Sequence, residues 1–85
     1  MRGRKPRRVA IVPSDLPVLR WIAGGRELPP YQIQRARIVL AIAEGARTGK
    51  VAEDVGVDEA TVWRACRRYE EQGLSGLLAD GRRSA

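Results

Sequence analysis

The sequence predicts an all-α fold, a small bundle of about four helices with a basic N-terminal arm that is disordered on its own. Apolar residues recur with helical spacing in several segments that glycines separate, and no segment is long enough to form a sheet. Eighty-five residues allow a single domain. We therefore divide the chain into an arm and lead-in over residues 1–13, a helical domain over 14–79 and a basic tail over 80–85.

The N-terminal arm concentrates positive charge. Residues 1–8 contain no acid and five cations: Arg2, Arg4, Lys5, Arg7 and Arg8. With Arg82 and Arg83 removed as well, residues 9–81 keep nine cations against ten acids, a net charge of −1. Arg2-Gly3-Arg4-Lys5-Pro6 resembles an AT-hook core with one lysine inserted. Such arms enter a narrow minor groove, and the alternative is general attraction to phosphates.

The first helix is expected to begin after residues 9–12, an apolar lead-in that ends at Pro13. Ser14 or Asp15 is the expected N-cap, with Pro17 in the opening turn, and Gly24-Gly25 ends the helix. The expected inner face consists of Leu16, Leu19, Ile22 and Ala23, with Val18 and Trp21 beside it.

A second helix is expected from about Pro30 to Glu44. Its inward residues are Ile33, Ala36, Val39, Leu40 and Ala43, and Ile38, Ala41 and Ile42 widen the apolar stripe. An apolar surface on nearly every side indicates the central buried helix. For Gln34, Arg35 and Arg37, on the outer side, a solvated face is the favoured interpretation.

Residues 48–69 predict a helix-turn-helix. Thr48 is the expected N-cap of a short helix, and Gly56 follows it, where a helix end commonly needs a left-handed residue. Asp58 is a good N-cap for the next helix because its carboxylate can accept from amides near Thr61. The inward stripes of the two helices are Val51, Ala52 and Val55, then Val62, Ala65, Cys66 and Tyr69. The small Ala52 allows the close contact that this motif requires.

The outer face of the second of these helices is where DNA contact is expected. Helical spacing places Ala60, Arg64, Arg67 and Glu71 opposite Val62, with Trp63 on the flank. We assign base contact to Glu59, Ala60, Trp63 and Arg64, and contact with the DNA backbone to Arg67 and Arg68. The alternatives are ion pairs of the last two arginines with Glu70 and Glu71, and packing of Trp63 on a neighbouring helix or a partner. After Gly73, residues 74–78 are expected to fold back as a short turn.

The composition excludes several classes of function. The chain has no histidine and a single cysteine, Cys66, which we expect to be a small core residue. We therefore expect no catalytic residue, no metal site, no cofactor and no small-molecule ligand. No apolar run approaches the roughly 20 residues of a membrane span. The expected location is the cytoplasm, with nucleoid association when DNA is bound.

Several segments resemble the N-terminal DNA-binding domain of bacterial insertion-sequence transposases of the mariner superfamily. They are Leu28-Pro29, Gln34-Arg35-Ala36-Arg37-Ile38-Val39-Leu40, Ala43-Glu44-Gly45, Val51-Ala52, Val55-Gly56-Val57, Thr61-Val62, Tyr69-Glu70-Glu71 and Gly73-Leu74-Ser75-Gly76-Leu77-Leu78. The resemblance implies a homeodomain-like bundle that binds the terminal inverted repeats of a mobile element on double-stranded DNA.

The sequence also departs from that family. The family's three metal-binding carboxylates lie beyond Ala85, so the chain is expected not to cut DNA by itself. The family tends to have more basic residues where Asp58, Glu59 and Trp63 stand, and a bulky aromatic where Ala65 stands. Three functions remain open: a transposase-type binding domain that acts with a separate catalytic subunit or as a remnant, a small transcriptional regulator that binds an operator as a homodimer, and a protein-interaction module centred on Trp63.

Overall fold

Helix α2 (Pro30–Ala43) is the element against which every other α-helix packs in the computed structural model, which describes residues 9–79. The remaining elements are a 3-10 turn, η1 (Pro13–Asp15), and the helices α1 (Leu16–Ala23), α3 (Thr48–Val55), α4 (Glu59–Gln72) and α5 (Leu74–Leu78). The all-α prediction is confirmed, with five α-helices within residues 9–79 where about four were expected. The arm cations Arg2, Arg4, Lys5, Arg7 and Arg8 and the tail 80–85 lie outside the described residues.

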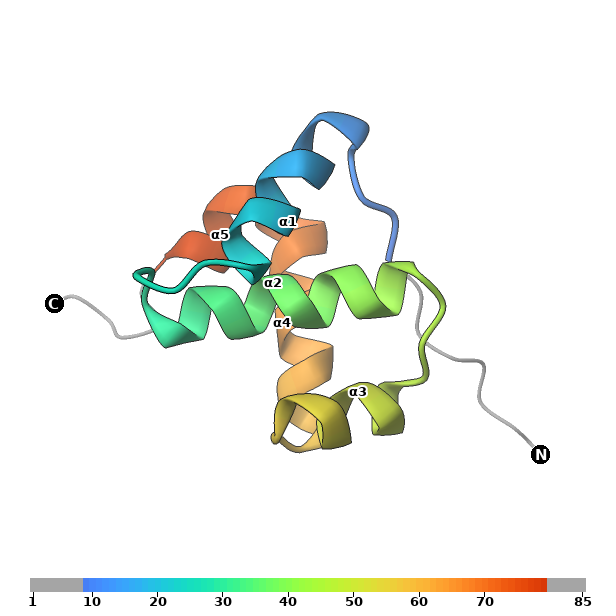
Figure 1. The fold of residues 1–85 in the computed structure, drawn as a ribbon. Coiled ribbons are helices and arrows are strands. Elements are labelled where there is room, and N and C mark those ends of the chain that lie inside the picture. Colours follow the sequence, from blue (N-terminus) through green and yellow to red (C-terminus); the bar gives the residue numbers. More distant parts are fainter. Residues whose placement is uncertain (1–8, 80–85) are drawn as a thin grey trace, which may run out of the picture.

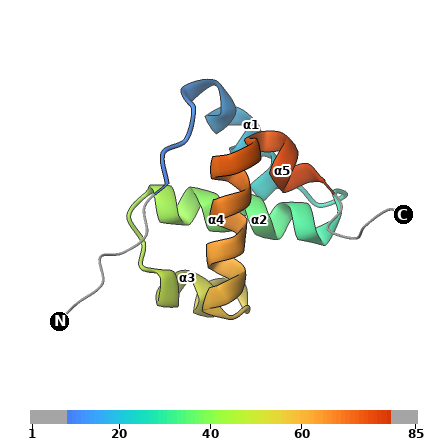
Figure 2. The ribbon, with the colours of Figure 1, turned by 180° about the vertical axis from the view of Figure 1, so that it is seen from behind.

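The predicted central position of α2 is confirmed. It crosses α4, with α1 on one side of it and α3 on the other (Figures 1 and 2). Its buried residues are Ala36, Ile38, Val39 and Ile42, each at most 1% exposed. Ala43 was expected to be inward but is exposed, because the helix ends there and the neighbouring helices cover the faces of Ile38 and Ile42 instead.

Asp15 is the N-cap residue of α1, one of the two predicted, whereas the N-cap prediction for α3 was wrong. Asp15 precedes α1 in a helical conformation, and its side chain makes no cap hydrogen bond. Arg47 is the N-cap residue of α3, while Thr48 is its first helical residue and is buried. In α1, Leu19 and Ile22 are buried as expected, but Val18 and Trp21 point outward, and Trp21 is 68% exposed. A two-turn helix with one covered face buries only a narrow stripe.

The hydroxyl of Tyr69 joins the start of the domain to α4. It accepts a hydrogen bond from the backbone N–H of Val12 (2.9 Å) and donates one to Oδ2 of Asp15 (2.7 Å). Burial, and then the bond to Asp15, raise the pKa of Tyr69, which keeps the phenol protonated as the donor. Asp15 therefore serves a residue 54 positions away instead of capping α1. Val9, the first residue that the structure describes, is buried in the same core.

Residues 74–78 form the helix α5 where a turn was expected. Gly76 permits its close approach to α4, since a methyl group there would lie 2.6 Å from the carbonyl oxygen of Arg68. The carbonyls at the end of α5 accept from the first turns of α2. The donors are Tyr31 and Gln32 to Leu78, and Nη1 of Arg35 to Leu77 (3.1 Å) and Ala79 (2.7 Å). These bonds fix the direction in which the chain leaves the bundle.

Tyr69→Phe should lower the free energy of unfolding by about 1–2 kcal/mol, because Val12 N–H and the Asp15 carboxylate both lose a partner. Urea denaturation at neutral pH measures the change. Tyr31→Phe is the matched control and should cost less, since the hydroxyl bonds that it removes, one donated to Leu78 and a longer one accepted from Gln32, are exposed or only partly buried. Equal costs for the two substitutions would contradict the role assigned to Tyr69.

Candidate nucleic-acid interface

The turn between α3 and α4 depends on Gly56. Its φ is 87°, in the left-handed region, and the N–H groups of Gly56 and Val57 donate to the carbonyl of Ala52 at 2.8 and 2.9 Å. A methyl group at Gly56 would meet nothing within 4 Å, so glycine is needed for its conformation and not for space. Val57 then turns back against the core. The predicted left-handed glycine turn is confirmed.

Asp58 begins α4 as the sequence predicts. Its Oδ1 accepts from the backbone N–H of Thr61 (2.9 Å) and from the Thr61 hydroxyl (2.6 Å). These two bonds lower the pKa of Asp58, although the side chain is fully exposed. The neighbouring Glu59 is exposed and lies over the first turn of α3, since a methyl group at Gly49 would be 3.2 Å from its Oε2. A carboxylate there faces the positive end of the α3 dipole.

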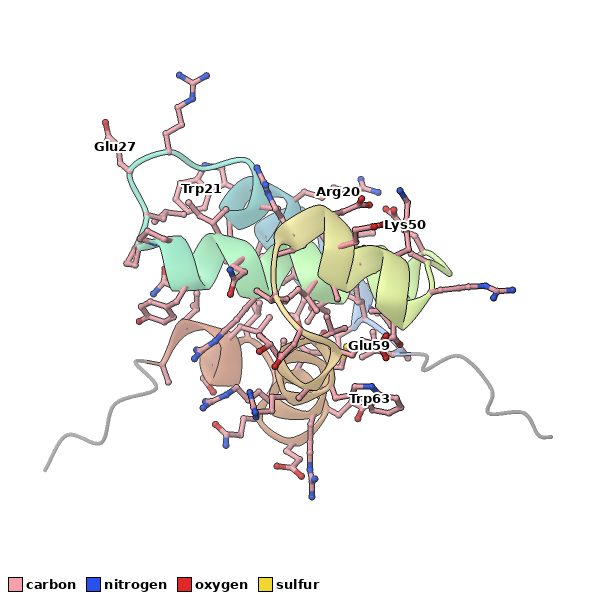
Figure 3. All side chains as sticks on the ribbon, turned by 90° about the horizontal axis from the view of Figure 1, so that it is seen from below. Arg20, Trp21, Glu27, Lys50, Glu59 and Trp63 are labelled. Carbon is pink, nitrogen blue, oxygen red and sulfur yellow. The ribbon has the colours of Figure 1, made fainter. Side chains whose placement is uncertain are left out.

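The two faces of α4 separate as predicted. Its buried residues are Val62, Ala65, Cys66 and Tyr69, and Cys66 is a fully buried core residue. Its outward residues Ala60, Arg64, Arg67 and Glu71 are exposed. Trp63 is half-buried and lies with Glu59 on one flank of the helix (Figure 3). Because the inner stripe is locked in the core, the rotation of α4 about its axis is fixed, and so is the set of side chains presented to a partner.

Charge on α4 is grouped along its length. Arg64, Arg67 and Arg68 occupy the middle of the helix, while its acids, Glu59, Glu70 and Glu71, stand near its ends. Nε of Arg67 pairs with Glu71 at 3.0 Å in a solvent-exposed bridge. Such a pair contributes only a few tenths of a kcal/mol, so a DNA phosphate can replace the glutamate at small cost. The intrahelical ion pair, the alternative for Arg67, is thus present in the structure.

The arginines of α2 serve the fold, which the sequence did not indicate. Arg35 is half-buried, its guanidinium stands 4.8 Å from the ring centroid of Tyr31, and it binds the end of α5. Nε of Arg37 donates to the carbonyl of Ala23 at the end of α1 (3.3 Å). The expected solvated face is therefore wrong for Arg35. Its acceptors are more than 40 residues away, and local periodicity carries no signal for them.

The side of the bundle away from α4 has a hollow lined by a tryptophan and by charged residues of both signs. Trp21 and Glu27 lie across α2 from α4 (Figure 3), and with Arg20 and Arg26 they line a hollow beside the loop after α1. Within residues 9–79, no group of His, Cys, Asp or Glu side chains could hold a metal ion. No helix in that range is long and apolar enough to cross a membrane.

Gly56→Ala should destabilise the domain by about 1 kcal/mol, because the added Cβ disfavours a left-handed backbone. Thermal or urea unfolding measures the change. Gly24→Ala is the matched control, since Gly24 has a negative φ and an added methyl would make only an ordinary 3.5 Å contact with the Arg20 carbonyl. A neutral result at Gly56 would contradict the need for glycine in this turn.

Asp58→Ala should destabilise the domain at neutral pH and lose that effect in acid. A lowered pKa in the folded state means that the charged carboxylate contributes stability above its ordinary pKa of about 3.9. The contribution is lost as the pH falls through the lowered value, so the stability difference between wild type and variant should start to shrink near pH 4 and continue to shrink at lower pH. Asp58→Asn, which can still cap but does not titrate, is the control. Denaturation series from pH 7 to pH 2 measure the difference in unfolding free energy between wild type and each variant. A difference that stays constant with pH for Asp58→Ala would contradict the role of the Asp58 carboxylate as the N-cap.

Residues 30–78 match the family model of the homeodomain-like domain HTH_23. The match runs from α2 to α5 and covers more than half of the 85 residues, while η1 and α1 precede it. The searches of curated proteins and of solved structures found no match. The match detects a domain of the DNA-binding helix-turn-helix kind and shows no catalytic family. The geometry of the α3–Gly56–α4 unit and the family match both indicate a helix-turn-helix. The chain belongs to the homeodomain-like helix-turn-helix family.

Proposed function

We propose that this protein binds double-stranded DNA through the outer face of α4, as the recognition domain of a transposase-type protein that binds terminal inverted repeats. One observation supports the DNA contact above all. The inner stripe of α4 is locked in the core, and this directs the exposed Arg64 and Arg67 away from the bundle. The order of the segments from Leu28 to Leu78 supports the transposase-type origin.

The proposed contacts follow the position of each side chain along α4. Glu59, Ala60, Trp63 and Arg64, in the first half of α4, face base edges, while Arg67 and Arg68 face phosphates. Arg64 is suited to guanine because its fork can bond O6 and N7 together, and Glu59 is suited to the amino group of cytosine. The basic arm would follow the adjacent minor groove. A separate catalytic subunit would supply any DNA cleavage.

The proposal is tested by selecting bound sequences from a pool of random duplexes at two salt concentrations. A shared sequence should emerge, and affinity for it should fall with salt at a log–log slope near −0.9 per phosphate contacted. An asymmetric selected site supports inverted-repeat binding by one protomer. A palindrome bound by a homodimer would instead support the regulator. Equal binding to all duplexes, or no binding, would overturn the proposal, and salt-independent binding of a protein partner through Trp63 would replace it.

Arg64→Ala should weaken binding to the selected site by about 1–3 kcal/mol and relax the preference at one base pair. Fluorescence anisotropy with the selected duplex and its single-base variants measures both effects. Arg26→Ala, in the loop across α2 from α4, removes the same charge outside the interface and should have little effect. An equal loss on every duplex would show that Arg64 contacts only the DNA backbone.

A further inference from the structure

A second feature of the α4 side is a hollow of about 210 Å³ between the first turns of α2 and the middle of α4. Gln34 and Arg35 line it from α2, and Thr61, Arg64 and Arg68 line it from α4. Three of its lining residues carry a guanidinium, and none of them is acidic. A concave site with this lining favours a small anion.

The guanidinium of Arg35 is held in place at this hollow. Its Nη1 donates to the carbonyls of Leu77 and Ala79, and its plane lies over Tyr31. These two acceptors are backbone carbonyls at the end of α5, and the bonds to them orient the guanidinium. A fixed charge attracts an anion without losing side-chain freedom on binding.

Arg68 differs from its neighbour Arg67 in its surroundings. Both arginines border an outer hollow on α4 together with Glu71, and Arg67 is paired with that glutamate, whereas only Arg68 also borders the hollow between α2 and α4. The hydrogen bonds and ion pairs within residues 9–79 do not use the side chains of Gln34 or Arg68. The Thr61 hydroxyl, by contrast, already donates to Asp58. Donors for an anion are therefore available from both helices, one on each side of the hollow.

We propose that this hollow seats one phosphate of the DNA backbone, with Arg68 and Gln34 donating to its oxygens and Arg35 supplying a fixed positive charge. The inference rests on the proposed function of α4. Arg64, at the edge of the hollow, remains directed to the bases. Residues from both α2 and α4 form the seat. A phosphate bound there therefore sets the angle at which α4 meets the duplex, as well as the position of α4 along the duplex.

Two substitutions test the seat with the selected duplex. Arg68→Gln should weaken binding on every sequence alike and reduce the log–log salt slope by about 0.9, the value for one phosphate contact. Gln34→Glu, which places a carboxylate in the seat, should weaken binding at least as much. Arg26→Gln is the matched control and should leave the slope unchanged. Thermal unfolding of each variant verifies that it is folded.

Neutral methylphosphonate groups, placed one at a time along the selected duplex, then locate the phosphate. At one position the replacement should cost the wild-type protein about tenfold or more in affinity, the size expected for a charged hydrogen bond. The same replacement should cost Arg68→Gln almost nothing, while Arg26→Gln should respond like the wild type. This loss of additivity identifies the phosphate that Arg68 contacts.

The outcomes separate the two proposals. If no duplex is bound, both fail. If a selected duplex is bound but every methylphosphonate costs Arg68→Gln and wild type equally, the seat is wrong and the proposed function stands. Titration with inorganic phosphate alone, followed by the side-chain amide NMR signals of Gln34, examines the other source of the same anion. One outcome would contradict the proposed seat and indicate a site for a free anion. In that outcome the hollow saturates at low millimolar phosphate, and Arg68→Gln leaves the affinity for the duplex unchanged.

Discussion

The burial of α2 is the constraint on which the rest of the structure depends. The other four α-helices all pack against it, and Ala36, Ile38, Val39 and Ile42 fill the space between them. A helix covered on several sides leaves little surface for polar residues. Those residues stand near its start, where Tyr31, Gln32 and Arg35 bind the carbonyls of α5. The element that builds the core thus also orients the end of the domain and borders the α4 interface.

The parts of the fold that the sequence predicts are those encoded by neighbouring residues. Gly56 has a left-handed conformation because two helices must reverse within a few residues, and Asp58 caps α4 through Thr61, three positions away. The stripe of Val62, Ala65, Cys66 and Tyr69 is likewise a local pattern, confirmed in full. Each of these features involves atoms within one or two helical turns, so propensity and spacing suffice to find them.

The features that the sequence does not predict involve partners far apart in the chain. Asp15 has the residue type of an N-cap, yet a buried tyrosine hydroxyl 54 residues away takes its carboxylate. Arg35 looks like a solvated residue until α5 brings carbonyls to it. Trp21 looks like a core residue, but no element in the described part of the chain covers its side of α1, and it is exposed. Periodicity indicates which residues could be inward, whereas packing decides which of them meet a neighbour.

Charge placement, more than net charge, distinguishes the α4 side of the described domain. Residues 9–79 hold nine cations and nine acids, so this part of the chain has no long-range excess that would attract DNA. Attraction of DNA to this part of the chain must then come from individual cations placed close to it. Salt screening limits the range over which exposed charges attract each other to about 10 Å. Arg67 faces a glutamate that a phosphate can replace, whereas Arg68 and Arg35 face each other across a hollow without acids. If the proposed phosphate seat is correct, a domain that is neutral on average would gain selectivity from it, because only a duplex docked at the right angle would bring a phosphate to that position.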